Sequence, residues 1–197
     1  METAIVARHA ESELSSIGIV NGDPSVHCGL SEHGEEQARA LGRALARREV
    51  DLYVTSEFER ARRTAEIALA GREVPWLMLA ELDDIRIGTF EGGSLDLYRR
   101  WSHSRPSKEH SPGGGESRVE AARRFAKGFR VVIERPERVI LVVTHGLAVR
   151  YLLDTIAGET PTQSHALVPC ARPFEFTQGE LAKALDRLEA WADEPSW

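Results

Sequence analysis

The chain has 197 residues, of which 42% are apolar and 28% charged, and its formal net charge is −6. This length is sufficient for one domain with a full hydrophobic core, and the negative charge argues against a general nucleic-acid-binding protein. The longest apolar run, residues 139–143, is far too short to span a membrane. A protein of this charge can still bind an anion, provided that positive charge is concentrated at one place.

The first part of the chain predicts two strands and two helices around a long loop. Residues 3–7 are apolar and β-branched, as in a buried strand, and the polar, glycine-containing stretch 11–29 is typical of a functional loop. Ser31 is a suitable N-cap for a helix that reaches about residue 48. We expect this helix to present one apolar face, which consists of Ala38, Leu41, Ala44 and Leu45. A strand over 52–55 and a helix over 59–70 follow.

The later elements continue the alternation of short apolar runs and amphipathic segments. In chain order we predict a short strand over 76–79, one or two helical turns around 95–101, a helix over 117–134, a strand over 138–144, a helix over 147–157, two weaker strands over 166–168 and 173–177, and a helix over 180–191. This alternation indicates an α/β protein with a mainly parallel, buried sheet. The sequence contains no repeat, low-complexity segment or linker, so we expect one domain over residues 1–197.

The N-terminus and the cysteines predict little chemistry. Residues 1–8 contain an acidic second residue and no long apolar segment, which is unlike a signal peptide and predicts a cytoplasmic location. Cys28 and Cys170 lie far apart and have neither a zinc-binding nor a disulfide-rich spacing. We expect two isolated, buried thiols.

Two histidines follow the two clearest apolar strands. His9 comes after residues 3–7 and directly follows Arg8, and His145 comes after residues 138–144. Ligands of open α/β sheets bind outside the carboxyl ends of the strands, so these histidines are candidates for a functional site. Arg60 follows the strand at 52–55 and can reach the same edge. Arginine carries a permanent charge and a planar fork that fits two phosphate oxygens, which points to phosphoryl chemistry.

These residues belong to six short motifs that follow one another along the chain. The motifs are residues 8–11 (RHAE), 29–38 (GLSEHGEEQA), 56–65 (SEFERARRTA), 87–92 (IGTFEG), 114–117 (GGES) and 143–146 (VTHG). In this order they resemble the histidine phosphatase superfamily, also called the phosphoglycerate mutase-like family, over roughly residues 3–157. The resemblance implies a three-layer α/β sandwich with helices on both faces of the sheet and a variable cap segment at about 92–115.

The resemblance also implies a role for each matching residue. His9 would attack phosphorus and carry a phosphohistidine, with a backbone acceptor on its other nitrogen to fix the tautomer. Arg8, Arg60 and His145 would hold the phosphoryl oxygens, and Gly146 would lie beside the substrate. The family requires no metal or other cofactor, and we expect none here.

The proton donor for the leaving group is expected at Asp84. The family places a glutamate four residues before the glycine of the motif at 87–92, and Asp84 stands at that distance from Gly88. Aspartate is intrinsically more acidic than glutamate, with an ordinary pKa of about 3.9 against about 4.3. Asp84 would therefore need burial or a nearby phosphate to stay protonated. Glu81 is the alternative donor, and a solvated acidic turn is the alternative without chemistry.

The chain departs from the family pattern at two further positions. Ala10 replaces a glycine, and Ser15 stands where many members have an asparagine that contacts phosphate. A serine hydroxyl can still donate to phosphate, with a shorter reach. The remaining histidines match no catalytic motif, and we interpret them as solvent-facing or structural: His27, His33, His103, His110 and His165. Of these, His103 and His110 lie in the variable cap segment, where they are also candidates to touch substrate.

We predict a phosphatase that acts on a small phosphorylated metabolite, without a nucleic-acid or membrane partner. A phosphoglycerate mutase is the first alternative, but the segment before the motif at 114–117 is short and suggests an open site with access for water. That segment does contain Arg99, Arg100, Arg105 and Lys108, so an acidic organic phosphate remains a possible substrate. The alternative of another class is a weakly catalytic module that binds a phosphorylated ligand. The sequence leaves the oligomeric state open.

Overall fold

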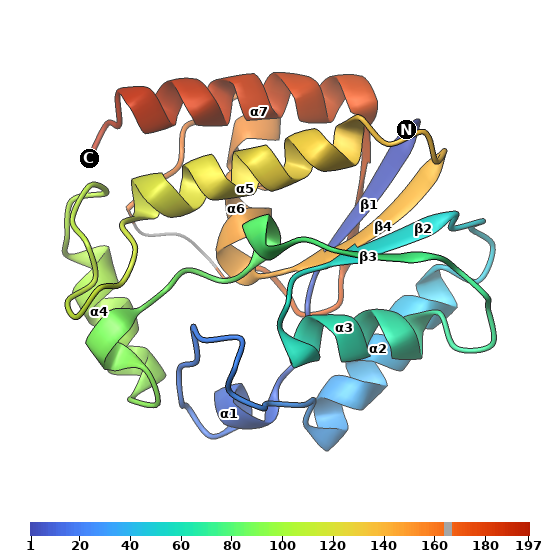
Figure 1. Cartoon of the computed structure of the whole chain (residues 1–197), viewed down its shortest axis with the longest axis horizontal. Helices are drawn as coiled ribbons and strands as arrows, with labels where there is room; N and C mark the ends of the chain where they lie inside the picture. The colour runs from blue at the N-terminus through green and yellow to red at the C-terminus, as the bar shows by residue number, and fades with distance from the viewer. Residues whose placement is uncertain (164–166) are drawn as a thin grey trace.

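The computed structural model describes residues 1–163 and 167–197, and its centre is a five-stranded sheet (Figure 1). The strands lie in the order β3-β2-β4-β1-β5, and all neighbours are parallel except β5, which is antiparallel to β1. Their bounds are β1 (Thr3–Arg8), β2 (Leu52–Thr55), β3 (Trp76–Met78), β4 (Val139–Thr144) and β5 (Pro173–Thr177). The predicted, mainly parallel sheet is therefore confirmed.

Seven α-helices surround the sheet in the described part of the chain. They are α1 (Glu13–Ser16), α2 (Glu32–Ala44), α3 (Glu59–Ala68), α4 (Leu95–His103), α5 (Arg118–Ile133), α6 (Gly146–Ile156) and α7 (Gln178–Asp193), with two short 3₁₀ turns, η1 (Ala80–Leu82) and η2 (Gly88–Phe90). Each predicted helix is present, and Ser31 is the N-cap of α2 as expected, where its side chain accepts from the Gly34 amide.

Three details of the sequence prediction are wrong or fall outside the structure. The helix predicted from Ser31 to about residue 48, which is α2, ends at Ala44. Ala44 was expected on its apolar face but is exposed, because the buried face consists of Ala38, Leu41 and the C-cap Leu45. The loop predicted over 11–29 contains the short helix α1. The weak strand predicted over 166–168 begins outside the described residues, and Leu167 and Val168 belong to no strand.

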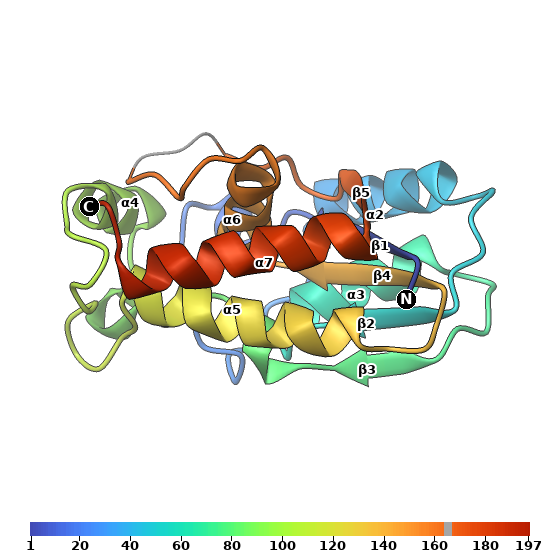
Figure 2. The same cartoon turned by 90° about the horizontal axis from the view of Figure 1, so that it is seen from above.

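The two faces of the sheet are covered by different helices, which gives the expected three layers (Figures 1 and 2). On one face, Ile5 and Leu141 form a core with α2 and α3, and on the other face Val6 and Val142 join a larger core with α5, α6 and α7. Successive side chains of a strand point to opposite faces. The continuous apolar runs of β1 and β4 thus contribute side chains to the cores on both faces of the sheet, as expected of strands buried on both sides.

The register of the central strands decides where the candidate residues meet. Arg8 at the end of β1 is paired with Thr144 at the end of β4, and Thr55 at the end of β2 is paired with Val143. The residues that follow these strands therefore leave the sheet at one common edge.

Within residues 1–163 and 167–197, no helix has the length and apolar character needed to cross a membrane. Both cysteines are free thiols, and Cys28 is buried as expected. Cys170 is only half-buried, so the prediction of complete burial is wrong for it.

Candidate active site

Three of the predicted site residues form a buried cluster at the common edge of the sheet. The Nε of Arg60 lies 3.2 Å from the Nε2 of His9, and its Nη2 lies 3.3 Å from the Nδ1 of His145. The two imidazole rings have centroids 5.1 Å apart. Each of these side chains exposes 4% of its surface or less. Residues 9, 60 and 145 are thus brought together from β1, α3 and β4, as the strand-end argument predicts.

The tautomer of His9 is fixed by its own backbone surroundings. Its Nδ1 lies 2.6 Å from the carbonyl oxygen of Ala10, which can only accept, so Nδ1 carries the proton. Nε2 is then unprotonated, and its electron pair accepts from the Nε of Arg60. Burial first, and then the positive charge of Arg60, hold the pKa of His9 well below the ordinary value of a histidine. The ring is therefore neutral near neutral pH, with Nε2 in the form that a nucleophile needs.

The second histidine is held between a hydroxyl and a carboxylate. The Nε2 of His145 lies 2.8 Å from the Oγ of Ser56, and its Nδ1 lies 3.4 Å from the Oδ2 of Asp84. Burial lowers the pKa of His145 to about 4, although Asp84 acts in the opposite direction. Phe58 packs against the same ring in an edge-on contact, which fixes its plane. Ser56 was part of a sequence motif, but its contact with His145 required the tertiary structure.

Of the three neighbouring acids, Asp84 is the one that reaches the cluster. Its Oδ2 lies 3.3 Å from the Nη2 of Arg60, and it lines the same pocket as His9. Burial alone would raise the pKa of Asp84, but His145 and Arg60 together lower it well below the ordinary value of an aspartate. Glu81 instead pairs with Lys127 at 3.3 Å, away from the pocket wall that the described residues form.

Asp83 has a suitable acidity but the wrong position. Burial raises the pKa of Asp83 to about 7. Its Oδ1, however, accepts from the backbone amide of Glu57 at 2.7 Å, and its side chain lies outside the pocket wall described here. The geometry therefore favours Asp84 over both neighbours as the acid that faces a substrate.

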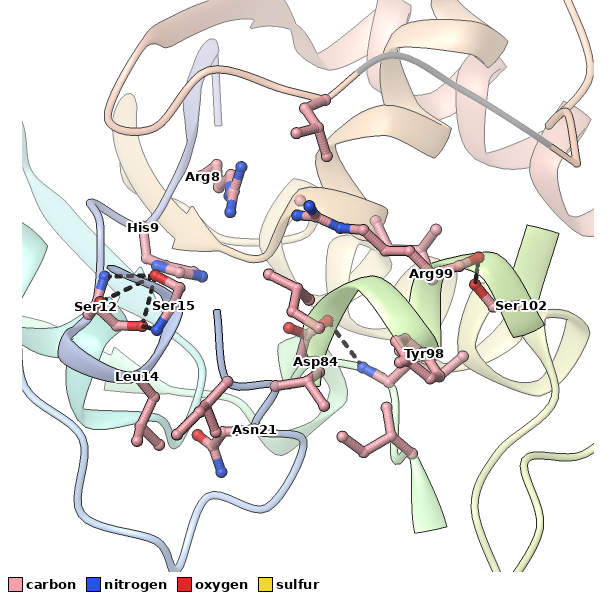
Figure 3. A pocket seen from close by; sticks show the side chains of 18 of the residues that line it. Arg8, His9, Ser12, Leu14, Ser15, Asn21, Asp84, Tyr98, Arg99 and Ser102 are labelled. Atoms are coloured by element: carbon pink, nitrogen blue, oxygen red, sulfur yellow. Dashed lines mark hydrogen bonds between the residues drawn. The ribbon is translucent and has the colours of Figure 1, made fainter. Parts of the chain in front are cut away.

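Arg8, Gly146 and Ser15 line the pocket, but they differ in what they can offer (Figure 3). Arg8 donates from Nη1 to the carbonyl of Val168 at 2.9 Å, and its Nε is buried without a hydrogen-bond partner in the described structure. Gly146 lies directly against Arg8, since a Cβ at this position would come within 3.4 Å of that Nε. The Ser15 hydroxyl bonds to the backbone and hydroxyl of Ser12, where it closes the first turn of α1. A phosphate contact from Ser15 would have to break these bonds.

Asn21 and Glu91 are site residues that sequence reasoning missed. Asn21 accepts from Arg60 twice, at 2.6 Å through its side-chain oxygen and at 3.1 Å through its backbone oxygen. Glu91 in turn accepts from the Asn21 side-chain amide at 2.9 Å and from the Gly22 amide at 2.7 Å. The glutamate of the motif at 87–92 therefore positions the loop that aims Arg60. The sequence predicts only that Asn21 and Gly22 lie in the loop over 11–29, and no local pattern connects them with residue 60.

A second buried ion pair supports the backbone around Asp84. Glu116 and Arg124 form a two-pronged pair with distances of 2.9 and 2.7 Å. The same guanidinium donates to the backbone oxygens of Asp83 at 2.8 Å and of Asp84 at 2.9 Å. The glutamate of the motif at 114–117 thus acts on the site indirectly, through an arginine that holds the acidic turn.

The remaining histidines separate into surface groups and one pocket residue. His27, His33 and His110 lie 3.5, 4.0 and 3.5 Å from the carboxylates of Glu59, Glu36 and Glu120, on the protein surface. His103 lines the pocket, and its contact with substrate stays a prediction. His165 lies outside the described residues.

Comparison with known proteins gives consistent matches. A family described as the histidine phosphatase superfamily (branch 1) matches residues 4–193. The uncharacterized phosphatase PhoE of Bacillus subtilis is 30% identical over 184 residues, which cover 90% of both chains. A 2,3-bisphosphoglycerate-dependent phosphoglycerate mutase of Methylobacterium radiotolerans is 30% identical over 175 residues, or 81% of each chain. The structure of Bacillus stearothermophilus YhfR is similar with a TM-score of 0.76 and 26% identity, over 88% of this chain and 89% of the other.

Proposed function

Since the chain belongs to the histidine phosphatase superfamily (branch 1), we propose that it hydrolyses a small phosphomonoester through a phosphohistidine on His9. The observation that carries this proposal is the arrangement around His9: a neutral, buried imidazole whose Nδ1 is occupied by the Ala10 carbonyl and whose Nε2 faces the pocket beside Arg60. The relative PhoE is also named as a phosphatase.

In the first step, the electron pair on Nε2 of His9 attacks phosphorus and the bond from phosphorus to the ester oxygen breaks. The charge on the equatorial oxygens is stabilised by Arg8, Arg60 and His145, the last of which must donate a hydrogen bond from a ring N–H group. The leaving oxygen takes a proton from Asp84. In the second step water attacks the phosphohistidine, gives its proton to Asp84 and releases inorganic phosphate with His9 restored.

The role of Asp84 requires a change of charge during the reaction. Before substrate binds, its carboxylate balances the guanidinium of Arg60 and contacts His145. A doubly charged phosphoryl group would take over both partners and repel the carboxylate, which raises its pKa and lets it hold a proton. The bound phosphoryl group is thus the nearby phosphate that Asp84 was expected to need in order to stay protonated.

Replacement of the nucleophile tests the proposal directly. We expect His9→Ala to abolish turnover of para-nitrophenyl phosphate, assayed with a chelator present, while the melting temperature stays close to that of the wild type. Incubation of the wild type with labelled substrate should trap a phosphoenzyme that is labile in acid and stable in base. His33→Ala, at an exposed histidine, is the matched control and should keep full activity. Full activity of the His9→Ala protein would exclude the proposed nucleophile.

A mutase is the second candidate function, because one relative carries that name and an arginine of the cap faces the pocket. Such an enzyme would interconvert phosphoglycerates and would need 2,3-bisphosphoglycerate as a primer. Hydrolysis of phosphomonoesters without the primer favours the phosphatase. Phosphate binding without any turnover between pH 4 and 8 would instead indicate a binding module. The cytoplasmic location and independence of metal belong to the same proposal, and the assay with chelator tests the latter.

A further inference from the structure

Beyond the phosphoryl cluster, the pocket continues toward the cap helix α4. The pocket wall extends well beyond the residues around His9, which leaves space for an organic group attached to the phosphate. The outer wall is formed by Tyr98, Arg99, Ser102 and His103 of α4 and by Arg118 at the start of α5. The composition of this wall bears on the substrate, because hydrolysis itself needs only the cluster around His9.

The charge of the pocket is opposite to that of the whole chain. Four arginines line it, while Asp84 is the one carboxylate among the described lining residues. Two of these arginines, Arg8 and Arg60, belong to the phosphoryl cluster. The other two are Arg99 and Arg118, which line the same cavity. Positive charge is thus concentrated in this cavity although the net charge of the chain is −6. Like charges gathered in a cavity attract an anion and are stabilised by it.

Arg118 is a buried cation that lacks an acidic partner in the described structure. It is 8% exposed, and it donates to the Ser102 hydroxyl at 3.1 Å and to the Gln163 carbonyl at 3.0 Å. Its guanidinium also lies 5.2 Å from the ring centroid of Trp197. Neutral partners fix its orientation but leave its charge unbalanced, and a buried unbalanced charge is costly. By contrast, the half-buried guanidinium of Arg124 is paired with the buried carboxylate of Glu116.

Arg99 extends from α4 across the pocket toward Arg8 (Figure 3). Burial and the positive charge of Arg8 both lower the pKa of Arg99, so the two guanidinium groups act on one another. Within the described residues it forms no ion pair, whereas Arg105 on the outer side of the cap pairs with Glu109 at 3.6 Å. The neighbouring Arg100 is exposed to solvent. Of the four cationic cap residues named from the sequence, Arg99 is therefore the one that faces the main pocket.

Apolar side chains make up much of the remaining pocket wall. They include Leu14, Ile19, Ile85, Ile87, Leu95 and Leu147. An uncharged polar body such as a bare sugar would leave its hydroxyl groups without partners along this surface. The wall favours a substrate whose organic part is a carbon chain or ring.

We propose that Arg99 and Arg118 form a second anion-binding subsite, and that the substrate is a phosphomonoester whose apolar organic part carries another anionic group, a carboxylate or a second phosphate. This inference rests on the proposed phosphatase function and specifies its substrate class. The phosphoryl group would lie on Arg8, Arg60 and the histidines, and the second anion would lie toward the cap.

Matched pairs of substrates that differ by one charge test this subsite. One pair is para-carboxyphenyl phosphate and para-carbamoylphenyl phosphate, and a flexible pair is the phosphate ester of hydroxyhexanoate and that of its amide. We expect the wild type to prefer the acid of at least one pair by about tenfold or more in kcat/KM, as for a hydrogen bond to a charged group. Para-phenylene bisphosphate, compared with para-carboxyphenyl phosphate, distinguishes a second phosphate from a carboxylate.

Charge-removing variants assign the preference to the two arginines. In Arg118→Met and in Arg99→Met, the ratio of kcat/KM for acid over amide should fall by about tenfold. Arg100→Met, at the exposed neighbour on the same helix, is the matched control and should keep the wild-type ratio. A ratio within one variant is insensitive to a loss of folded protein, and Arg99→Met provides a second measurement if Arg118→Met does not fold.

The possible failures are distinguishable. If the protein hydrolyses the phosphomonoesters but neither pair shows a preference for the acid, the subsite is excluded and Arg118 has only a structural role. A preference that both variants retain would equally exclude these residues. If no substrate is turned over, the proposed function fails, and calorimetric binding of para-carboxybenzyl and para-carbamoylbenzyl phosphonate then tests the subsite by the same ratio. Equal affinities of the wild type for the two phosphonates would overturn it.

Discussion

At the scale of single residues, Asp84 has opposite charge requirements before and during the reaction. Its contacts with Arg60 and His145 keep the pKa of the free carboxyl low, so it is ionised throughout the range from pH 4 to 8. An anion that binds to Arg60 and His145 removes this stabilisation. Binding of a phosphate-like anion should therefore be coupled to the uptake of a proton by Asp84.

This coupling predicts that anion binding tightens as the pH falls. Sulfate keeps a constant charge between pH 4 and 8, so a calorimetric titration with sulfate reports only the protein's protons. We expect affinity to rise by up to about tenfold per unit decrease in pH, because one proton is taken up per anion. In Asp84→Asn this dependence should shrink to the part contributed by His145 and His9. Identical slopes in the two proteins would exclude Asp84 as the group that takes up the proton.

The proton-donor role also predicts how Asp84→Asn depends on the leaving group. An alkyl phosphate needs a proton on its leaving oxygen, whereas para-nitrophenolate leaves readily without one. We expect a loss of about 10²- to 10⁴-fold in kcat/KM with alkyl phosphates and a much smaller loss with para-nitrophenyl phosphate. Glu81→Gln, next to the same turn but paired with Lys127, should affect neither substrate strongly. Equal losses on both substrates in Asp84→Asn would assign the donor to another residue.

At the scale of elements, the N-terminal half of α2 and its N-cap support the segment that follows β1. The Gln37 side chain accepts from the Glu11 amide at 2.9 Å, and the Ser31 hydroxyl donates to the Glu11 carboxylate at 2.7 Å. Gly34 allows this close packing, since a Cβ there would lie only 2.0 Å from the backbone oxygen of Glu11. Residues of the motif at 29–38 therefore position Glu11 and the segment beside His9.

Gly34→Ala should disturb both stability and activity. The added methyl group would push the backbone at Glu11 away from α2, and overpacking of this kind costs about 1–3 kcal/mol in the free energy of unfolding. Urea denaturation measures the stability, and para-nitrophenyl phosphate turnover measures the effect on the site. Gly179→Ala in α7 is the matched control, because a Cβ there meets no atom within 4 Å. Equal stability of the two variants would contradict the packing argument.

The turn at η2 depends on a glycine for a different reason. Gly88 has a φ of +61°, and a Cβ there would lie 1.9 Å from the Pro112 carbonyl oxygen. Only glycine accommodates this conformation and this approach without strain. The turn leads directly to Glu91, which holds Asn21 and through it Arg60. A glycine far from the substrate thus contributes to the aim of a phosphate-binding arginine.

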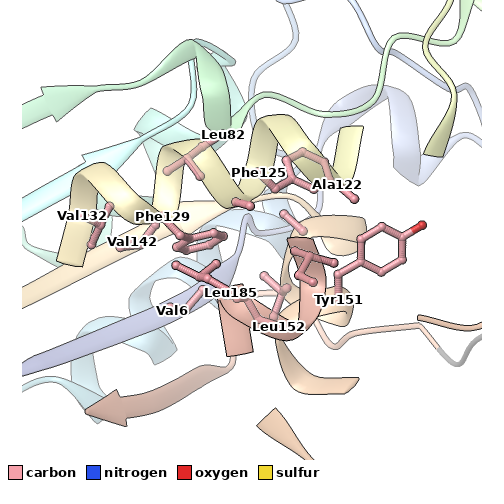
Figure 4. Packing of buried hydrophobic residues seen from close by; sticks show 14 of the residues in the cluster. Val6, Leu82, Ala122, Phe125, Phe129, Val132, Val142, Tyr151, Leu152 and Leu185 are labelled. Atoms are coloured by element: carbon pink, nitrogen blue, oxygen red, sulfur yellow. The ribbon is translucent and has the colours of Figure 1, made fainter. Parts of the chain in front are cut away.

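At the scale of the whole molecule, two separate cores hold the sheet between the helical layers. Figure 4 shows Phe129 of α5 among Val6, Val142 and Leu185, from β1, β4 and α7. Phe129 therefore joins α5 to three elements that are far from one another in the sequence. The larger core therefore fixes β1 and β4 relative to each other, and with them the two histidines at their ends.

Phe129→Ala should lower the free energy of unfolding by about 3–5 kcal/mol, because it leaves a cavity at a fully buried position. The measurement is equilibrium denaturation in urea, with the slope checked against the wild type. Leu97→Ala, at a side chain that is 56% exposed, is the control and should change stability by less than about 0.5 kcal/mol. A similar small loss in both variants would show that α5 does not stabilise the sheet in this way.

Local sequence was sufficient for the elements and for the principal site residues. The apolar runs 3–7 and 138–144 specify buried strands whatever surrounds them, and residues that follow parallel strands must leave the sheet at one edge. Arg8, His9, Arg60 and His145 could therefore be placed near one another in advance, whereas Asp84 was expected beside them because of the family resemblance. The family to which these motifs belong was also evident from their order, and the comparisons confirm it.

Only the tertiary structure decided what each side chain touches. The exposure of Ala44, the internal bonding of Ser15 and the contacts of Asn21 with Arg60 depend on segments that fold back from distant parts of the chain. Periodicity records which face of an element is apolar, but it contains no information about which loop covers that face. Arg118 shows this limit most clearly. Its sequence position is the ordinary start of a helix, and its buried, unbalanced charge exists only because α4 and α5 meet beside the pocket.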